Sequence, residues 1–261
     1  MIALFTDFGT RDAYVAQLKG AIVCINPHAV VLDLNHAVGQ FDIRQAAYLL
    51  ERSAAYFPAA TIFVAVIDPG VGSTRRPLLL HTDANKFYVG PDNGLFTGVL
   101  AREGYRAAYT LQETVYYRLP DVSVTFHGRD IFGPVAAHLS LGVLPACFGP
   151  CVTDLVTLPA PRLSVHGEGI EGELLHIDHF GNLLTNIPPD LLTPIRPGQH
   201  LSVTLRGTTV TLPFCTTYAD AQPGEFVCLL SSNAEFEIAC VQGSAADCFA
   251  AQVGETIILR W

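Results

Sequence analysis

Basic residues are scarce in this chain of 261 residues. Only 15 lysines and arginines stand against 24 aspartates and glutamates, which gives a formal net charge of -9. Nucleic-acid-binding proteins present a basic face, so this balance argues against a nucleic-acid partner. No apolar run approaches the length of a membrane span, and we therefore expect no membrane association.

Cysteine pairs and glycine fingerprints are also missing. The seven cysteines form no Cys-x-x-Cys pair, which indicates reduced thiols in a cytoplasmic protein and no metal site. The loop at residues 6–12, after the first predicted strand, has no Gly-x-Gly-x-x-Gly and no other glycine-rich run. This argues against an NAD-dependent oxidoreductase and against a methyltransferase. The loop at residues 68–76 lacks the Lys-Ser/Thr ending of a P-loop.

What the sequence does contain is an alternation of strand and helix patterns in its first part. This rhythm predicts an α/β fold with a doubly wound, mostly parallel sheet and helices on both faces. Asp12 and Asp42 are predicted to cap two of the helices. The predicted strands are 2–5, 30–34, 62–67, 78–81 and 87–89, and the predicted helices are 12–22, 42–57, 95–101 and 131–140.

The pattern changes where four prolines interrupt residues 144–161. Short strands separated by turns follow, so we predict an N-terminal α/β domain over residues 1–158 and a smaller, barrel-like β domain over residues 159–261. The strands predicted in the second domain are 173–177, 183–186, 201–205, 208–212, 226–230 and 256–259.

The predicted strand at residues 62–67 is followed by the most informative loop of the chain. The loop contains Asp68, two glycines, Arg75 and Arg76. Ligands of open α/β sheets bind at the carboxyl ends of the strands, so the loop is a candidate site. Asp68 could instead close a turn, with both arginines solvated. The combination of a carboxylate, glycines and arginines favours the site.

Three further polar clusters are candidates. Asp7 and Asp12 follow the first strand and could grip ribose hydroxyls or an ammonium group, although Asp12 could simply cap a helix. His127 lies in a loop before the helix at 131–140, where a lone histidine can also be structural. Residues 176–182 could form only a turn or bulge, and a zinc site with His176 and His179 is not supported by their spacing.

Five motifs occur in one order over most of the chain. They are Thr-Asp-Phe-Gly at 6–9, Asp-Pro-Gly-Val-Gly at 68–72, Gly-Pro-Asp-Asn-Gly at 90–94, Phe-His-Gly-Arg-Asp at 126–130 and Asp-His-Phe-Gly-Asn at 178–182. Together they resemble the S-adenosyl-L-methionine (SAM) hydroxide adenosyltransferases, hydrolytic relatives of the fluorinating and chlorinating enzymes. The resemblance implies hydrolysis of SAM to adenosine and L-methionine without a cofactor. It also implies a homotrimer whose sites lie between the N-terminal domain of one subunit and the C-terminal domain of the next.

The resemblance assigns Asp68, Arg75 and His127 to the catalytic positions. A sulfonium departs as a neutral thioether, so the reaction needs only an oxygen nucleophile aligned with the C5′–S bond in a dry pocket. Arg75 would stabilise hydroxide character on a bound water, and His127 would orient this water or accept its proton. Asp68 would fix the geometry of the group. Whether water or hydroxide attacks stays open.

Asp68 also separates hydrolysis from halide chemistry. The resemblance places it where the halogenating relatives carry a neutral residue. A carboxylate about 4 Å from a halide costs roughly 1 kcal/mol even in water and more in a dry pocket. The sequence therefore favours hydrolysis over halogenation.

The same resemblance assigns the substrate-binding residues. Asp7 matches the carboxylate that holds the ribose diol, and Asp12 and Asp178 match contacts to the methionine ammonium. Each aromatic residue among the others could instead be an ordinary core residue, and the asparagine could serve only its turn. The other assigned positions, which contact the ribose, the adenine or the methionine part, are Phe41, Phe126, Phe180, Asn182 and Ser232.

One segment departs from the family pattern. Residues 231–235 read Ser-Ser-Asn-Ala-Glu, with Ala234 in place of a glycine, and residues 240–243 lack an expected asparagine. Alanine restricts the backbone, and Glu235 would repel a substrate carboxylate unless it is turned away. This departure favours the alternative of a non-catalytic SAM-binding or nucleoside-binding protein. The presence of all three catalytic positions favours an enzyme.

Overall fold

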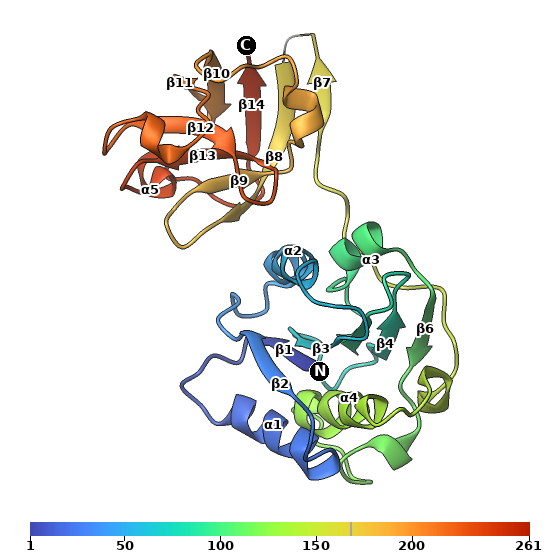
Figure 1. Cartoon of the computed structure of the whole chain (residues 1–261). Coiled ribbons are helices and arrows are strands. Elements are labelled where there is room, and N and C mark those ends of the chain that lie inside the picture. Colours follow the sequence, from blue (N-terminus) through green and yellow to red (C-terminus); the bar gives the residue numbers. More distant parts are fainter. Residues whose placement is uncertain (168) are drawn as a thin grey trace. The chain divides into compact units, whose positions relative to one another are not determined.

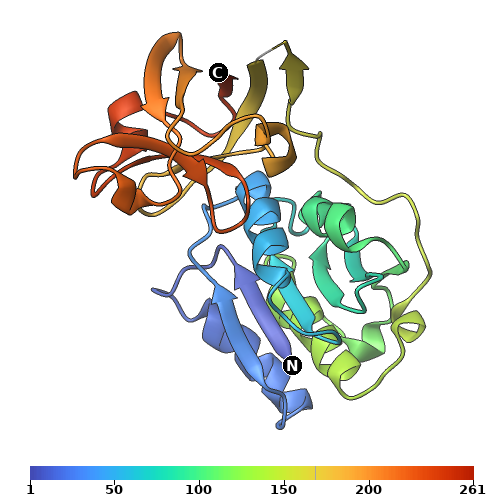
Figure 2. The same ribbon diagram turned by 45° about the horizontal axis from the view of Figure 1, so that its top comes forward.

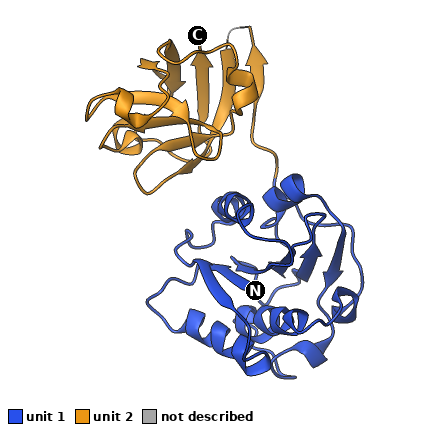
Figure 3. Cartoon of the chain, in the orientation of Figure 1, with its two compact units in different colours: residues 1–158 blue, residues 159–261 orange. Residues whose placement is uncertain are grey.

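The chain forms two compact units in a computed structural model that describes residues 1–167 and 169–261. Unit 1 comprises residues 1–158 and unit 2 residues 159–261 (Figure 3). Two clusters of buried apolar side chains belong to unit 1, and two others belong to unit 2. Each unit therefore has a hydrophobic core of its own.

Unit 1 is built on a six-stranded sheet. Its strands are β1 (Ile2–Thr6), β2 (Val31–Asn35), β3 (Ile62–Val66), β4 (Pro77–His81), β5 (Phe87–Pro91) and β6 (Ala107–Thr110). They lie in the order β2-β1-β3-β5-β4-β6, and β1 and β2 run side by side in Figure 2. The pairs β1–β2, β1–β3 and β3–β5 are parallel, whereas β4 runs antiparallel to β5 and β6. The predicted mostly parallel sheet is confirmed, with β4 as the reversed strand.

Helices cover both faces of this sheet (Figure 1). Its helices are α1 (Tyr14–Ile25), α2 (Ile43–Ala54), α3 (Thr97–Glu103) and α4 (Gly133–Ser140). Successive strand residues alternate between the faces, so Leu4 and Val64 pack with α1 and α4. Phe5 and Phe63 pack with α2 and α3 on the other face. Both faces are therefore apolar, as a doubly wound sheet requires.

The first residues of α1 and α2 test the N-caps predicted at Asp12 and Asp42. Asp42 caps α2, because its carboxylate accepts a hydrogen bond from the amide of Gln45. The predicted cap at Asp12 is wrong, since α1 begins at Tyr14, its cap residue is Ala13, and no side chain caps it. The helix predicted at 131–140 starts earlier, as a π-helical turn (Gly128–Phe132) that continues into α4. The 3₁₀ turns of the two units are Thr114–Tyr116, Pro145–Phe148, Pro189–Leu192 and Tyr218–Asp220.

Unit 2 is an almost closed antiparallel barrel. Its elements are β7 (Ser164–His166), β8 (Gly169–Ile177), β9 (Leu183–Thr185), β10 (His200–Leu205), β11 (Thr208–Pro213), β12 (Phe226–Leu230), β13 (Phe236–Cys240), α5 (Ala245–Phe249) and β14 (Thr256–Arg260). The strand order is β11-β10-β14-β8-β9-β13-β12, and β7 pairs with β8. A bridge between Phe214 and Cys228 of β12 brings the two end strands together. The predicted barrel-like fold is confirmed.

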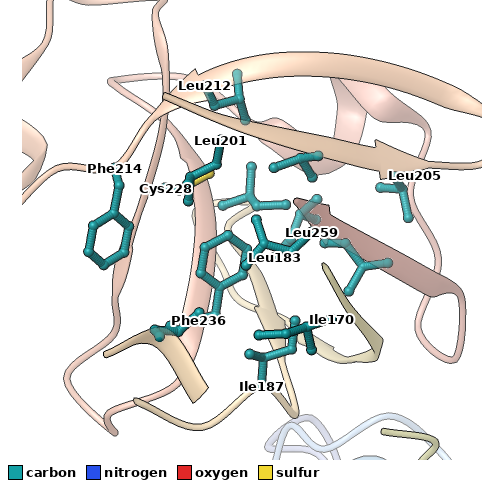
Figure 4. Close-up of a cluster of buried hydrophobic side chains, with 14 of the residues drawn as sticks. Ile170, Leu183, Ile187, Leu201, Leu205, Leu212, Phe214, Cys228, Phe236 and Leu259 are labelled. Carbon is teal, nitrogen blue, oxygen red and sulfur yellow. The ribbon is translucent and has the colours of Figure 1, made fainter. Parts of the chain in front are cut away.

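The barrel interior is filled by apolar side chains from most of its strands. Leu183, Leu201, Phe236 and Leu259 lie among them, each fully or almost fully buried (Figure 4). Strand β13, which supplies Phe236, was not predicted, because it directly follows the atypical turn at 231–235. In the described part of the chain, no helix combines the length and the apolar character that crossing a membrane would need.

Candidate active site

A charged network lies where β3 ends. Asp68 follows β3 by two residues, Arg75 ends the same loop, and His127 precedes the π-helical turn. Nε of Arg75 donates to both carboxylate oxygens of Asp68, at 2.9 and 3.0 Å. Its Nη2 also donates to Asp68 and, at 2.7 Å, to Nδ1 of His127. The structure thus brings these three residues together, and the side chains of Asp68 and Arg75 are only 5% and 9% exposed.

A close backbone approach holds the two loops together. Gly72 has φ of 78°, and a Cβ atom there would lie 2.6 Å from the carbonyl oxygen of Val124. Only glycine avoids this clash and adopts this conformation without strain. The glycine therefore allows the loop with Asp68 to approach the segment that leads to His127.

The buried side chain of Asp130 stabilises the segment that leads to His127. Its buried carboxylate accepts hydrogen bonds from Arg129 at 2.6 and 2.8 Å and from the amide of Ser123 at 3.0 Å. Burial by itself raises the pKa of Asp130, but the bonds from Arg129 and from the Ser123 amide hold this pKa below its ordinary value. The loop that carries His127 is thus fixed at both ends.

Two donors of the network remain for a ligand. Burial and the nearby charge of Arg75 lower the pKa of His127, so the ring is neutral at pH 7. Because a guanidinium only donates, Nδ1 of His127 must accept, and the ring proton lies on Nε2. Nη1 of Arg75 is buried and has no hydrogen-bond partner among the described residues. The network therefore keeps two N–H groups that no described residue accepts, and one of them belongs to His127, which lines the neighbouring cavity.

A cavity of about 370 Å³ lies beside this network in unit 1. Several of its lining residues were not assigned from the sequence, notably Phe8 and Tyr14. Phe8 lies inside the first motif and Tyr14 two residues after Asp12, but no spacing rule marked them. The cavity is lined by six of the predicted site residues: Asp7, Asp12, Phe41, Asp68, Phe126 and His127.

Phe41 is presented at this cavity by Asp7. The carboxylate of Asp7 accepts the amide hydrogen of Phe41 at 2.9 Å. Phe41 has φ of 64°, a region that non-glycine residues seldom adopt, and its side chain is 66% exposed. It is therefore no core residue, and its ring is available to a planar ligand.

Unit 2 contains a separate cavity of about 800 Å³, lined by Asp178, Phe180, Asn182 and Tyr218 among others. The carboxylate of Asp178 accepts hydrogen bonds from the amides of Phe180 and Asn182, both at 2.9 Å. It also accepts one from the side-chain amide of Asn182 at 3.0 Å. The side chain of Asn182 thus stabilises the turn to which it belongs. The ring of Phe180 is 72% exposed, so Phe180 is no core residue.

Tyr218 gives this cavity a second polar wall. Its hydroxyl donates to Glu237 at 2.5 Å, and burial raises the pKa of both groups. The hydrogen bond from Tyr218 opposes this rise for Glu237, because it favours the charged carboxylate.

The atypical turn at 231–235 is held by hydrogen bonds between its own residues. The Ser231 hydroxyl accepts the amides of Asn233 and Glu235, both at 3.2 Å. Ala234 has φ of 59°, in the left-handed region that a glycine would occupy without strain. Ser232 is exposed in this turn and lines neither cavity.

Arg76 is separated from the site although it follows Arg75 directly. Its guanidinium donates to Asp92 at 2.6 and 3.0 Å and to Asp154 at 2.6 Å. It therefore ties the motif at 90–94 to the last segment of unit 1. Within residues 1–167 and 169–261, no three His, Cys, Asp or Glu side chains gather in a way that could hold a metal ion.

Two family models match most of the chain. The N-terminal domain of the SAM hydroxide adenosyltransferases matches residues 2–149, and the C-terminal domain of the same family matches residues 172–258. This chain belongs to the SAM hydroxide adenosyltransferase family. The sequence resemblance is thereby confirmed at the level of the family.

Individual relatives extend over nearly the full length. The chain is 38% identical to the (R)-S-adenosyl-L-methionine hydrolase of Salinispora tropica, with 98% of this chain and 96% of the relative covered. It is 30% identical to the fluorinase of an Actinoplanes species, with 92% and 90% covered. The crystal structure of an uncharacterized conserved protein from Thermotoga maritima superposes with a TM-score of 0.96, at 32% identity and with both chains fully covered.

Proposed function

We propose that this protein hydrolyses SAM to adenosine and L-methionine. The observation that carries the proposal is the buried guanidinium of Arg75, which joins Asp68 to His127 beside the cavity of unit 1. The family membership supports it, and so do the full-length relatives that are named SAM hydrolases. An intact network of this kind would be unnecessary in a protein that only binds SAM.

In the proposed reaction, an oxygen nucleophile attacks C5′ of the ribose on the side opposite to sulfur. The C5′–O bond forms as the C5′–S bond breaks, and the electron pair of that bond leaves with sulfur as the neutral thioether of methionine. Nη1 of Arg75 and Nε2 of His127 would donate to the attacking oxygen and favour hydroxide over water, since both carry protons. The proton lost by the water passes to solvent.

This scheme gives His127 an orienting role. Its Nδ1 lone pair already accepts from Arg75, and its Nε2 carries the proton, so neither nitrogen is free to act as a base. Asp68 holds the guanidinium in place through both of its oxygens.

Substrate recognition would be shared between the two cavities. Asp7 accepts the Phe41 amide through Oδ2, and its second oxygen would accept from the ribose diol. Asp12 would attract the methionine ammonium, Phe41 and Phe126 would contact the nucleoside, and Phe180 would pack on adenine. From the second cavity, Asp178 would add negative charge and Asn182 would contact an adenine edge. Ser232, in the exposed turn outside this cavity, would donate to the methionine carboxylate.

Because these residues belong to two units, we also propose that the units are domains of a homotrimer. Each site would combine the N-terminal domain of one subunit with the C-terminal domain of the next, as in the family. Light scattering would then report a mass three times that of the 28.1 kDa chain. A fully active monomer would refute this part. A cytoplasmic location also belongs to the proposal, and cell fractionation would test it.

Incubation with SAM in ¹⁸O-labelled water tests the reaction. Adenosine labelled at its 5′ oxygen, together with unlabelled methionine, would establish attack by water or hydroxide at C5′. Tight binding of SAM without product would refute hydrolysis and support a receptor, the alternative favoured by the atypical turn at 231–235. Failure to bind SAM at all would refute both.

A further inference from the structure

Three aromatic rings of unit 1 line the cavity beside the charged network. They belong to Phe8, Tyr14 and Phe126. The ring centroids of Phe8 and Phe126 are 5.6 Å apart, those of Tyr14 and Phe126 5.4 Å, and those of Phe8 and Tyr14 6.1 Å. The corresponding interplanar angles are 76°, 89° and 62°. The three rings are thus close to mutually perpendicular, like the walls at a corner.

The packing around this aromatic corner (Phe8, Tyr14 and Phe126) differs from that of an ordinary core. Tyr14 is 48% exposed, so its ring is not there to fill the protein interior. Gly128 lets the other two rings approach the backbone, because a Cβ atom there would lie 3.2 Å from the Phe8 ring and 3.4 Å from the Phe126 ring. The guanidinium of Arg129, which donates to Asp130, lies over the Phe126 ring at 5.0 Å and makes a cation–π contact with it.

The charges around the corner also suit a cation. Asp7, Asp12 and Asp68 line the same cavity, and Asp68 is paired with Arg75. The faces of aromatic rings are negative, and perpendicular rings bind cations that carry alkyl groups. A sulfonium with its methyl group is such a cation.

The neighbours of the rings place this cation near the reacting bond. Phe8 follows Asp7, the proposed ribose ligand, and Phe126 precedes His127 of the charged network. A group held by the corner would therefore lie close to both the ribose and the charged network, on the side of C5′ that faces away from the attacking oxygen, where the sulfur of the C5′–S bond must be.

We propose that Phe8, Tyr14 and Phe126 bind the sulfonium centre of SAM and distinguish it from neutral thioether nucleosides. This inference rests on the proposed function and adds a basis for its selectivity. The positive charge on sulfur disappears as the C5′–S bond breaks, so the rings attract the substrate more strongly than either product. They stabilise the ground state more than the transition state, and their contribution appears in affinity rather than in kcat.

Tyr14→Leu tests the proposal, with Tyr14→Phe as the matched control that keeps the ring. Calorimetry measures binding of SAM and of S-adenosyl-L-homocysteine, its neutral thioether analogue, in a His127→Asn background that suppresses turnover. Tyr14→Leu is expected to weaken SAM binding by about 5- to 30-fold, the factor that corresponds to about 1–2 kcal/mol for a cation–π contact. Binding of the neutral analogue should change less than about twofold, and Tyr14→Phe should bind both like the parent.

In the otherwise unchanged chain, Tyr14→Leu should raise KM for SAM without lowering kcat. Equal weakening of both ligands, or no weakening of SAM, would overturn the assignment, because the ring would then serve only packing. If Tyr14→Leu does not fold by circular dichroism, Phe8→Leu is measured in the same way.

The outcomes separate this inference from the proposed function. Wild-type protein that prefers SAM over the neutral analogue but forms no adenosine would refute hydrolysis, and loss of that preference in Tyr14→Leu would still support the aromatic corner. Adenosine formation with a preference that Tyr14→Leu leaves unchanged would support hydrolysis and refute the corner.

Discussion

The two candidate regions are stabilised in different ways. In unit 1, the loop that holds Asp68 and Arg75 bonds to His127 from a distant part of the chain, and the side chains of Asp68 and Arg75 are largely buried. In unit 2, the bonds of Asp178 and of Ser231 stay within turns of five residues. A change at Arg75 removes both links of this network at once, whereas the local turns keep their backbone bonds when a side chain changes. This explains how unit 2 can carry an atypical turn on an intact barrel.

The largest effect is expected from Arg75→Lys. Lysine cannot bond both oxygens of Asp68 and also reach His127, and it presents no second planar N–H to the nucleophile. We expect the rate of adenosine formation to fall by about 10²–10³-fold, as for the loss of one preorganised donor. The rate is measured by chromatography of adenosine at saturating SAM.

Arg76→Lys is the matched control for this variant. Arg76 bonds Asp92 and Asp154 away from the cavity, so the substitution should lower the unfolding temperature and leave kcat unchanged. Equal losses of activity in the two variants would mean that the network in unit 1 is structural, and the contrast between the two regions would disappear.

The pH dependence of kcat sharpens the role of His127. Burial and Arg75 lower its pKa from the ordinary value of 6.5, and the neutral ring is the proposed active form. Protonation of the His127 ring should therefore reduce kcat only below pH 6.5. At pH values below the lowered pKa, kcat should fall about tenfold for each pH unit. His138, whose pKa is also lowered by burial, does not line the cavity, and His138→Asn should keep this profile. A fall in rate that begins above pH 6.5 in the parent and is absent in His127→Asn would contradict the neutral ring.

The smallest effect is expected in unit 2. Ala234→Gly removes the strain of an alanine in the left-handed region, which is worth about 1 kcal/mol. Part of this gain in stability is lost, because glycine has more conformational freedom in the unfolded chain. We expect the free energy of unfolding to rise by about 0.5 kcal/mol in urea titrations, with kcat unchanged. Ala246→Gly, inside helix α5, should instead lose about 1 kcal/mol. Equal destabilisation by both would show that the turn does not store strain.

Much of the fold could be predicted from patterns in the sequence. Strands of unit 1 such as β1 and β3 are apolar on both faces, a pattern that predicts a doubly wound sheet. The cap at Asp12 was misplaced because a carboxylate before a helical pattern suits a cap and a binding site equally well. Strand β6 has only four residues and β13 follows a strained turn, so neither had a clear local signal.

By itself, the sequence determined the fold class, the family and the residue types of the candidate site, since these depend on local periodicity and on motifs of a few residues. Only the tertiary structure decided that Arg75 bridges Asp68 and His127 while Arg76 turns away, and that His127 accepts from Arg75 through Nδ1. It alone placed Phe8, Tyr14 and Phe126 at nearly perpendicular angles around one cavity. These features depend on how distant segments pack, because side-chain directions and distances between loops follow from the whole sheet and its helices.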